Sequence, residues 1–310
     1  MSALICGSFA YDTIMVYPGY FKNEILPDKV HMLNVSFQVP EMRREFGGCA
    51  GNIAYNLCLL GGDGAPMGTV GKDFAPYAEW MDQNGISRQH LRTIEEAYTA
   101  QAYITTDLDA NQLTAFHPGA MNFAHTQSVP DAGITLGMVS PDGREAMIQH
   151  AREFAEKSIP FFFDPGQGMP MFDGETLKAF VEQANYVTVN DYEFELLRER
   201  TGWSAQDITN RVDALIVTGG SKGSVIHHAG RRFDIPVATA KEVVDPTGCG
   251  DAYRAGLIYG VMRSLDWETT GRVASLMGAL KIEKPGTQNH RFTLNEFRAH
   301  FKAEFGHSLD

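Results

Sequence analysis

The segment Val243-Val-Asp-Pro-Thr-Gly-Cys-Gly-Asp251 leads directly into Ala252-Tyr-Arg-Ala-Gly-Leu-Ile-Tyr-Gly-Val-Met-Arg-Ser264, whose apolar residues have the spacing of a buried helix. A glycine-rich loop therefore enters a helix N-terminus. Such a terminus carries unpaired backbone N–H groups and the positive end of the helix dipole. We expect the backbone of Gly248, Cys249 and Gly250 to hold an anion there, because small side chains let the anion approach closely.

Two carboxylates, Asp245 and Asp251, flank these glycines. Asp251 stands at the helix start, where an aspartate often serves only as the N-cap. A carboxylate beside an anion hole is also what phosphoryl transfer to an alcohol needs, since backbone donors hold the phosphoryl oxygens while the carboxylate accepts the alcohol proton. The Cys249 thiol lies near the same terminus, and we expect it to be acidic and open to oxidation.

Short apolar runs recur along the chain and alternate with amphipathic helical segments; they cover residues 3–7, 159–163, 186–189 and 214–218. This alternation predicts a mostly parallel sheet with helices on both faces. Residues from about 14 to 46 and from about 97 to 117 are instead rich in β-formers and turn residues. They predict a small β-rich lid, an excursion from a single domain that spans residues 1–310.

The bulk composition describes an ordinary globular protein of 310 residues, 44% of them hydrophobic. The 38 Asp and Glu residues outnumber the 26 Lys and Arg residues, for a formal charge of -12, which argues against nucleic acid or an anionic membrane as the main partner. Cys6, Cys49, Cys58 and Cys249 are scattered, with no paired spacing. The N-terminal residues lack a basic segment and a long apolar run, so we expect a reduced, cytoplasmic protein.

A second glycine-rich turn, Phe46-Gly-Gly-Cys-Ala-Gly-Asn52, also leads into a helical segment. Paired glycines let a ligand press against the backbone, although they also suit a simple tight turn. Asp12 closely follows the first predicted strand, at the sheet edge where open α/β sheets bind ligands. The alternative is an aspartate that only forms a turn.

Two further motifs follow predicted strands. Asn190-Asp-Tyr-Glu193 has the pattern of a helix cap with an acid in the first turn, and Val217-Thr-Gly-Gly-Ser-Lys-Gly223 that of a hairpin turn. Gly68-Thr-Val-Gly-Lys-Asp73 lacks the spacing of a Walker loop, and Gly7-Ser-Phe-Ala-Tyr-Asp12 has one glycine where a dinucleotide fingerprint has three. The sequence therefore predicts neither of those nucleotide sites.

Taken together, these motifs resemble the ribokinase-like family, also called the phosphofructokinase B family of carbohydrate kinases. Its C-terminal signature, Asp-x-x-Gly-x-Gly-Asp, matches at Asp245, Gly248, Gly250 and Asp251. The resemblance implies a three-layer α/β/α sandwich with a mostly parallel central sheet and a small β-rich lid. It implies that Asp251 is the catalytic base and that the backbone from Gly248 to Gly250, Cys249 included, forms the anion hole.

The same resemblance assigns the remaining site residues. Gly48 faces the sugar, while Asn52 and Asp12 hydrogen-bond its hydroxyls. ATP is the phosphoryl donor, and Glu193 helps to place Mg²⁺ through water. The residues implied near the nucleotide are Asn190, Thr218, Gly220, Gly223, Ser275 and Gly278. A site for a monovalent cation such as K⁺, which many relatives form beside the anion hole, maps to Asp245 and Thr247.

The lid segments at 34–40, 44–48 and 116–121 resemble bacterial adenosine and nucleoside kinases more than ribokinase. Phe116 and Met121 suit a purine between them, although they also suit packing at the lid hinge. We therefore expect an ATP-dependent kinase for the 5′-hydroxyl of adenosine or another nucleoside; the alternatives are a ribokinase or other sugar kinase, and a non-catalytic sensor. An exposed β-rich lid also favours a homodimer through edge-to-edge pairing.

Overall fold

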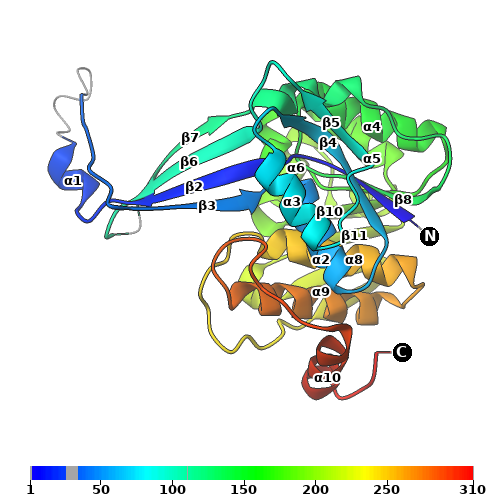
Figure 1. The fold of residues 1–310 in the computed structure, drawn as a ribbon. Helices are drawn as coiled ribbons and strands as arrows, with labels where there is room; N and C mark the ends of the chain where they lie inside the picture. Colours follow the sequence, from blue (N-terminus) through cyan, green and yellow to red (C-terminus); the bar gives the residue numbers. More distant parts are fainter. Residues whose placement is uncertain (1, 26–33, 110, 310) are drawn as a thin grey trace.

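A large, mostly parallel sheet forms the centre of the molecule in the computed structural model, which describes residues 2–25, 34–109 and 111–309 (Figure 1). The strand order is β13-β12-β11-β10-β9-β8-β1-β4-β5, parallel from β11 to β5 and antiparallel through β12 and β13. The bounds are β1 (Ser2–Cys6), β4 (Gly64–Gly71), β5 (His90–Ile94), β8 (Ile134–Val139), β9 (Phe161–Phe163), β10 (Tyr186–Asn190), β11 (Ala214–Thr218), β12 (Ser224–His228) and β13 (Arg231–Ile235).

Helices cover both faces of this sheet, because its strands alternate their buried side chains between two cores. In β1, Ala3 and Ile5 join one core while Leu4 and Cys6 join the other. The first core is closed by α2 (Cys49–Leu59), α3 (Ala75–Gln83), α8 (Cys249–Met262), α9 (Trp267–Ile282) and α10 (Leu294–Phe305). The second is closed by α4 (Arg144–Glu156), α5 (Gly174–Gln183), α6 (Asp191–Thr201) and α7 (Ala205–Thr209). The predicted three-layer sandwich is confirmed.

The lid is a second sheet, in the order β3-β2-β6-β7, that projects from the body of the molecule (Figure 1). Its strands are β2 (Ala10–Val16), β3 (Glu41–Gly47), β6 (Ala100–Thr106) and β7 (Gln112–His117), and the short α1 (Phe21–Glu24) lies beyond them. β2 pairs with β6 in parallel, which joins the two distant segments into the one lid that the sequence predicted. β2 begins at Ala10 rather than near residue 14, because the first segment continues almost without a break from β1.

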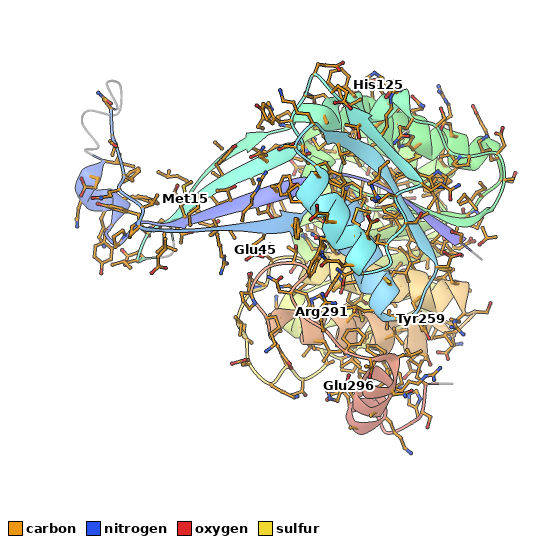
Figure 2. All side chains as sticks on the ribbon, in the orientation of Figure 1. Met15, Glu45, His125, Tyr259, Arg291 and Glu296 are labelled. Atoms are coloured by element: carbon orange, nitrogen blue, oxygen red, sulfur yellow. The ribbon has the colours of Figure 1, made fainter. Side chains whose placement is uncertain are left out.

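Figure 2 shows how the lid joins the body: Met15 lies out along the lid, and Glu45 lies where β3 returns to the helices. Glu45 Oε2 accepts a hydrogen bond from the Asn289 side chain at 2.8 Å. A lid strand is thus linked to the segment that follows α9. None of the helices in the described ranges has the length and apolar character that crossing a bilayer requires.

The four predicted apolar runs all form strands of the large sheet, as β1, β9, β10 and β11. Sequence reasoning did not identify β4 as a strand. Its sequence, Gly64-Ala-Pro-Met-Gly-Thr-Val-Gly71, contains glycine and proline residues that signal loops, yet the strand is almost wholly buried beside β1. Tertiary packing there outweighs the local preference of the residues.

Candidate active site

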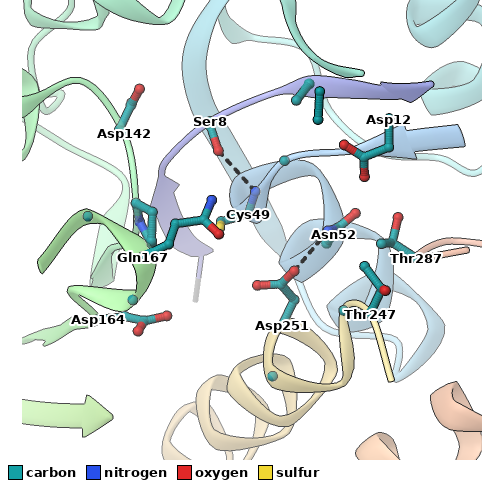
Figure 3. Close-up of a pocket in the computed structure, with 18 of the residues that line it drawn as sticks. Ser8, Asp12, Cys49, Asn52, Asp142, Asp164, Gln167, Thr247, Asp251 and Thr287 are labelled. Atoms are coloured by element: carbon teal, nitrogen blue, oxygen red, sulfur yellow. Dashed lines mark hydrogen bonds between the residues drawn. The ribbon is translucent and has the colours of Figure 1, made fainter. Parts of the chain in front are cut away.

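Two helix N-termini, those of α2 and α8, meet beside the lid and face a cavity of about 710 Å³ (Figure 3). Gly48 precedes α2 with a φ of 89°, and Gly248 precedes α8 with a φ of 79°, so each helix begins from a backbone conformation that favours glycine. Asn52 of α2 and Asp251 of α8 join the helices, with Nδ2 donating to Oδ2 at 2.8 Å. The sheet places both glycine-rich motifs at one site.

Asp251 is the third residue of α8, and Gly248 occupies the N-cap position. The alternative interpretation of Asp251 as a helix cap is therefore wrong. Its carboxylate lines the cavity and accepts the hydrogen bond from Asn52. Burial raises the pKa of Asp251 to about 6, although the Asn52 hydrogen bond and the Arg254 charge oppose that rise. The group is thus poised to accept a proton near neutral pH.

The anion-binding backbone differs at one position from the prediction. Among the described residues, nothing accepts a hydrogen bond from the N–H groups of Gly248 and Gly250. The Cys249 N–H instead donates to the Pro246 carbonyl at 3.1 Å, which closes a turn just before α8. The expectation that Cys249 supplies an anion-hole donor does not hold, because its N–H is already used.

The predicted acidic thiol at Cys249 is also wrong. Burial is the largest influence and raises the pKa of Cys249 to about 11, with Asp245 and Asp251 adding to the effect. The Cys249 Sγ lies 3.9 Å from the Asp245 carbonyl oxygen, and the nearby Lys281 charge lowers its pKa by less than burial raises it. A mostly protonated thiol is a poor target for mild oxidation.

Asp12 and Asn52 differ in how they are held. No described residue donates a hydrogen bond to the Asp12 carboxylate, which lines the cavity on β2. Burial, with the nearby charges of Glu45 and Asp245, raises the pKa of Asp12 to about 6. The Asn52 amide is fixed on both sides, since Oδ1 accepts from Gln288 Nε2 at 2.9 Å while Nδ2 donates to Asp251. Asp12 has open acceptor positions toward the cavity, whereas Asn52 also holds the Asp251 carboxylate in place.

Apolar side chains line the cavity on its lid side. Phe116 of β7 and Met121 of the 3-10 helix η2 (Gly119–Thr126) line it together with Ile104 of β6 and Met171, which ends the 3-10 helix η3 (Gly166–Met171). Phe116 is 50% exposed, so it is not consumed by packing at the lid hinge. This wall suits a flat apolar ring system better than a free sugar.

The motif from Asn190 to Glu193 forms the predicted helix cap and also reaches the cavity. The Asn190 side chain accepts from the Glu193 N–H at 2.7 Å, and Glu193 Oε2 accepts from the Asn190 N–H at 2.8 Å. Both residues line the cavity. Burial raises the pKa of Glu193, with the nearby Asp164 adding to it. One motif therefore starts α6 and presents a carboxylate to the site.

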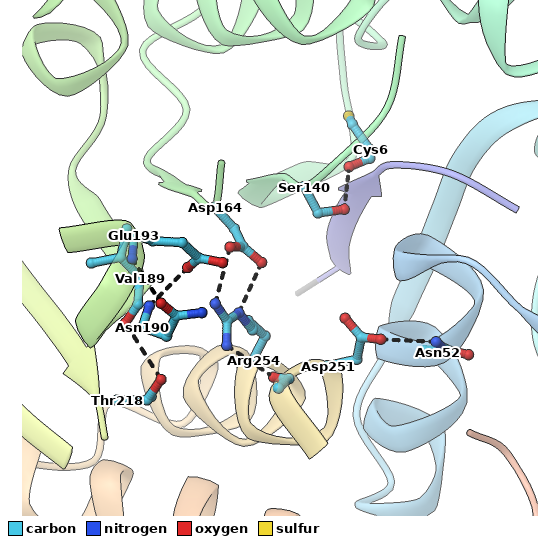
Figure 4. Close-up of polar contacts among 11 residues, drawn as sticks. Cys6, Asn52, Ser140, Asp164, Val189, Asn190, Glu193, Thr218, Asp251 and Arg254 are labelled. Carbon is cyan, nitrogen blue, oxygen red and sulfur yellow. Dashed lines mark hydrogen bonds and ion pairs between the residues drawn. The ribbon is translucent and has the colours of Figure 1, made fainter. Parts of the chain in front are cut away.

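The other residues implied near the nucleotide lie outside the cavity. Thr218 pairs with Asn190 across β11 and β10, so it stands one strand further along the sheet edge (Figure 4). Gly220 and Gly223 flank the hairpin between β11 and β12, as the alternative interpretation predicted. Ser275 donates to the Pro236 carbonyl and accepts from the Ala238 N–H. Gly278 faces the carbonyl oxygen of Cys249 at the start of α8.

Arg254 and Asp164 form a buried ion pair in the cavity floor that sequence reasoning missed (Figure 4). Arg254 Nε donates to Asp164 Oδ2 at 2.8 Å, and Nη2 donates to Oδ1 at 3.0 Å. Their side chains are 8% and 4% exposed. Asp164 directly follows the strand Phe161–Phe163, so the rule that placed Asp12 at the carboxyl end of a strand was sufficient to find it.

Further cavity residues were missed in the same way. Asp142 follows β8 after two residues, Ser8 follows β1, and Gln167 lies in η3, which follows β9. Ser8 Oγ accepts a hydrogen bond from the Cys49 N–H at the start of α2. Burial raises the pKa of Asp142 to about 8. Each of these positions is a polar residue at the carboxyl end of a parallel strand, a signal present in the sequence.

Asp245, one of the two residues predicted to bind K⁺, already has hydrogen-bond donors at its oxygens. The Asp245 carboxylate accepts from the N–H groups of Thr247 and Gly286, both at 2.9 Å. The Asp245 carbonyl oxygen accepts from the Lys281 ammonium at 2.7 Å. Each of these Asp245 oxygens already accepts a hydrogen bond, and one of the donors is itself a cation, so Asp245 is a poor ligand for K⁺.

Mg²⁺ has a limited set of protein ligands here. No cluster of three or more His, Cys, Asp or Glu side chains suited to a metal occurs in the described parts of the chain. Mg²⁺ that arrives with a nucleotide needs only one or two carboxylates besides phosphate and water. Glu193 fits that role, because its Oε2 is tied to the backbone and thereby fixes the direction of the whole carboxylate.

Comparison with known proteins gives consistent matches over the whole fold. Residues 9–293 match the pfkB family carbohydrate kinase. A nucleoside kinase from Burkholderia thailandensis, solved in complex with inosine, is 51% identical with a TM-score of 0.91, and the match covers 99% of this chain and 100% of that chain. The same kinase in complex with ADP-inosine is 54% identical with a TM-score of 0.88, covering 99% and 97%. A nucleoside kinase from Methanocaldococcus jannaschii is 33% identical over 259 residues, 83% of this chain and 85% of its own length.

Proposed function

The chain belongs to the pfkB family of carbohydrate kinases, phosphotransferases that act on hydroxyl groups, and we propose that it is an ATP-dependent nucleoside kinase that phosphorylates the 5′-hydroxyl. A purine nucleoside such as adenosine or inosine is the proposed acceptor. ATP with Mg²⁺ is the proposed donor. We place the enzyme in the cytoplasm, which suits its four free cysteines.

The observation that carries this proposal is the position of Asp251. Its carboxylate, with a pKa raised to about 6, lies in one cavity with two free N–H groups at the start of α8. A base and an anion hole at one end of a cavity are the parts that phosphoryl transfer to an alcohol requires. The same cavity extends to the apolar wall under the lid, where a nucleobase fits.

The residues act as follows in the proposed reaction. Asp12 accepts hydrogen bonds from ribose hydroxyls, and the second N–H of the Asn52 amide donates to the ribose. Asp251 then accepts the proton of the 5′-hydroxyl as the hydroxyl oxygen attacks the γ-phosphorus of ATP. The bond between the γ-phosphorus and the bridging oxygen to the β-phosphate breaks, and ADP leaves. The Gly248 and Gly250 N–H groups stabilise the charge that develops on the phosphoryl oxygens. Phe116 and Met121 hold the base and exclude water from the reacting atoms.

ATP is proposed to lie along the carboxyl edge of the sheet, from Asn190 toward Thr218 and Gly223. Asn190 and Thr218 are paired neighbours on β10 and β11, so a nucleotide that enters from the hairpin reaches the cavity at Asn190. Mg²⁺ bound to the phosphates neutralises their charge, and Glu193 is the carboxylate proposed to position it through water. Ser275 and Gly278 are proposed to line the adenine end.

The test is ATP consumption by the purified protein with adenosine, inosine, cytidine, ribose and fructose as acceptors. The matched control is Asp251→Asn, which keeps the size of the side chain but removes the base. We expect turnover on nucleosides and a loss of at least about 100-fold in the variant, because general-base catalysis contributes that much. Nucleoside binding, measured by isothermal titration calorimetry, is expected to stay nearly unchanged.

Each other outcome has a definite meaning. Turnover on free sugars alone would assign the protein as a sugar kinase and leave the apolar wall without a nucleobase. Nucleoside binding without turnover on any acceptor would identify a sensor. Near-normal turnover of Asp251→Asn would remove Asp251 from its role as the base.

A further inference from the structure

Lys281 is a buried lysine whose ammonium faces backbone carbonyl groups. It lies near the C-terminal end of α9 and is 0% exposed. Its Nζ donates to the carbonyl oxygen of Asp245 at 2.7 Å and to that of Lys284 at 3.2 Å. Lysine is almost never fully buried unless its charge has partners. The ammonium of Lys281 therefore joins the loop that contains Asp245 to the loop that contains Lys284.

The two loops have distinct connections to the site. Residues 243–248 lead into the anion-binding start of α8, and residues 283–288 follow α9. Backbone hydrogen bonds join the first loop to the end of α9, because the N–H groups of Val244 and Asp245 both donate to the Ile282 carbonyl. The Gly286 N–H adds a bond to the Asp245 carboxylate. The Lys281 ammonium links the two loops as well, because it donates to the carbonyl oxygen of Asp245 in one and of Lys284 in the other.

The second loop also touches the catalytic residues. Thr287 packs beside Gly248, within 3.1 Å of where a Cβ on that glycine would lie. Gln288 donates to Asn52, which in turn donates to Asp251. A displacement between the two loops would therefore move the anion hole relative to the base.

We propose that the Lys281 ammonium serves as a built-in monovalent cation that positions the anion-binding loop, so that this enzyme transfers the phosphoryl group without K⁺. This inference rests on the proposed nucleoside kinase function and names a positioning residue for it. The observation behind the proposal is that the Asp245 oxygens already accept hydrogen bonds, one of them from the Lys281 ammonium. A cation held by a covalent tether needs no binding equilibrium with the solvent.

The chemistry of the two cations supports the replacement of K⁺ by an ammonium group. An ammonium group and K⁺ both bind to carbonyl oxygens, but the ammonium binds through N–H donors in fixed directions. Burial lowers the pKa of Lys281, whereas the nearby Asp245 and Glu45 carboxylates favour its charged form. The carbonyl acceptors likewise favour the charged form, as hydrogen bonds to it do. The geometry therefore places a positive charge beside the loop that binds the phosphoryl group.

The first experiment measures nucleoside phosphorylation by the native enzyme with K⁺, Na⁺ or tetramethylammonium as the only monovalent cation. We expect the turnover number to agree within about twofold across the three, at matched ionic strength so that screening is equal. A steep rise in turnover with K⁺ would overturn the proposal. Because the enzyme would still phosphorylate nucleosides, that result would leave the proposed function intact, whereas silence in every buffer would refute the function itself.

The second experiment removes the ammonium with Lys281→Ala and leaves space between the two carbonyl groups. In tetramethylammonium we expect turnover to fall about 100-fold, because a small displacement of the anion hole costs that much. Added K⁺ or NH₄⁺ is expected to raise the turnover of this variant at least tenfold, because the ion fills the position that the ammonium has left. The matched control is Lys284→Ala, which removes an exposed side chain but keeps the Lys284 carbonyl; its turnover is expected to equal that of the native enzyme.

Rescue by small cations distinguishes a positioning role from a structural one. A variant that merely loses stability would show a lower melting temperature and no cation-dependent recovery, which would overturn the proposal. Full turnover of Lys281→Ala in tetramethylammonium would overturn it as well. If the variant does not fold, the cation series on the native enzyme decides the question alone.

Discussion

Asp251 and Asp12 show how one cavity gives two carboxylates similar acidities and different tasks. Burial raises the pKa of each to about 6. Asp251 accepts a hydrogen bond from Asn52, whereas the Asp12 carboxylate has no donor among the described residues. The hydrogen bond favours the charged form of Asp251, so the pKa of this proposed base depends on the Asn52 side chain that holds it.

A pH profile tests this arrangement. As the proposed base, Asp251 has to be deprotonated for turnover, so kcat/KM is expected to fall as the pH drops through about 6. Asn52→Ala removes a hydrogen bond that lowers the pKa, so the acid limb is expected to move to higher pH. Asp12→Asn removes a charge that raises the pKa, and it is expected to move the limb to lower pH. Profiles measured on the three proteins check these directions; equal midpoints in all three would contradict them.

The buried pair of Arg254 and Asp164 predicts a large effect on stability. Arg254→Met leaves Asp164 as a buried charge without its partner, which is expected to lower the free energy of unfolding by about 3–5 kcal/mol. The matched control is Arg88→Met, which breaks a similar two-bond pair with Asp82 on the surface. That change is expected to cost about 0–1 kcal/mol. Urea unfolding followed by circular dichroism measures both, and equal losses would contradict the buried pair's importance.

At the scale of elements, the site depends on where helices begin. α2, α6 and α8 all start beside the cavity, and the residues before or within their first turns line it. α6 shows the double use most clearly, since Asn190 and Glu193 satisfy the helix end and face the proposed nucleotide. Local capping chemistry and function are therefore not competing interpretations of this motif.

Substitution at Asn190 separates these two uses. Asn190→Ala removes the cap of α6 and is expected to lower the free energy of unfolding by about 1 kcal/mol. It is also expected to raise the KM for ATP, because the side chain faces the cavity. Thr293→Ala removes the same kind of cap from α10, far from the cavity, and should lower stability with an unchanged KM. Steady-state kinetics and thermal unfolding provide the readouts; the same KM in both variants would restrict Asn190 to its structural role.

At the scale of the whole molecule, the lid carries exposed apolar side chains and an open strand edge. All six residues of β7 are exposed, and Leu113 among them is 44% exposed. A free strand edge with apolar side chains tends to pair with another chain. We therefore expect a homodimer formed through the lids.

Light scattering after size-exclusion chromatography measures the molar mass in solution and so tests for the dimer. The native protein is expected to have twice its chain mass of 34.2 kDa. Leu113→Lys places a charge on the β7 edge and is expected to weaken the dimer at least tenfold, since charged residues block edge pairing. Lys302→Ala, on α10, is the control and is expected to leave the mass unchanged. A monomeric native protein would contradict the lid dimer.

The sequence by itself determined the reaction class and the outline of the fold. Gly48, Gly248 and Asp251 occupy positions that follow from local rules, because glycine-rich loops before helices present free N–H groups whatever lies around them. The apolar runs that form β1, β9, β10 and β11 were predictable for the same reason, since continuous apolar strands must be buried on both faces.

Only the tertiary structure decided which distant groups meet. Asn52 and Asp251 are hydrogen-bonded across 199 positions, and Arg254 pairs with Asp164 across 90. Burial then set the acidity of Cys249 against the local rule for helix N-termini, because loss of solvation raised the pKa of the thiol more than the Lys281 charge lowered it. Lys281 likewise gained its position only when α9 packed beside the loop before α8. Local sequence encodes the donors and acceptors, whereas packing decides their solvation and partners.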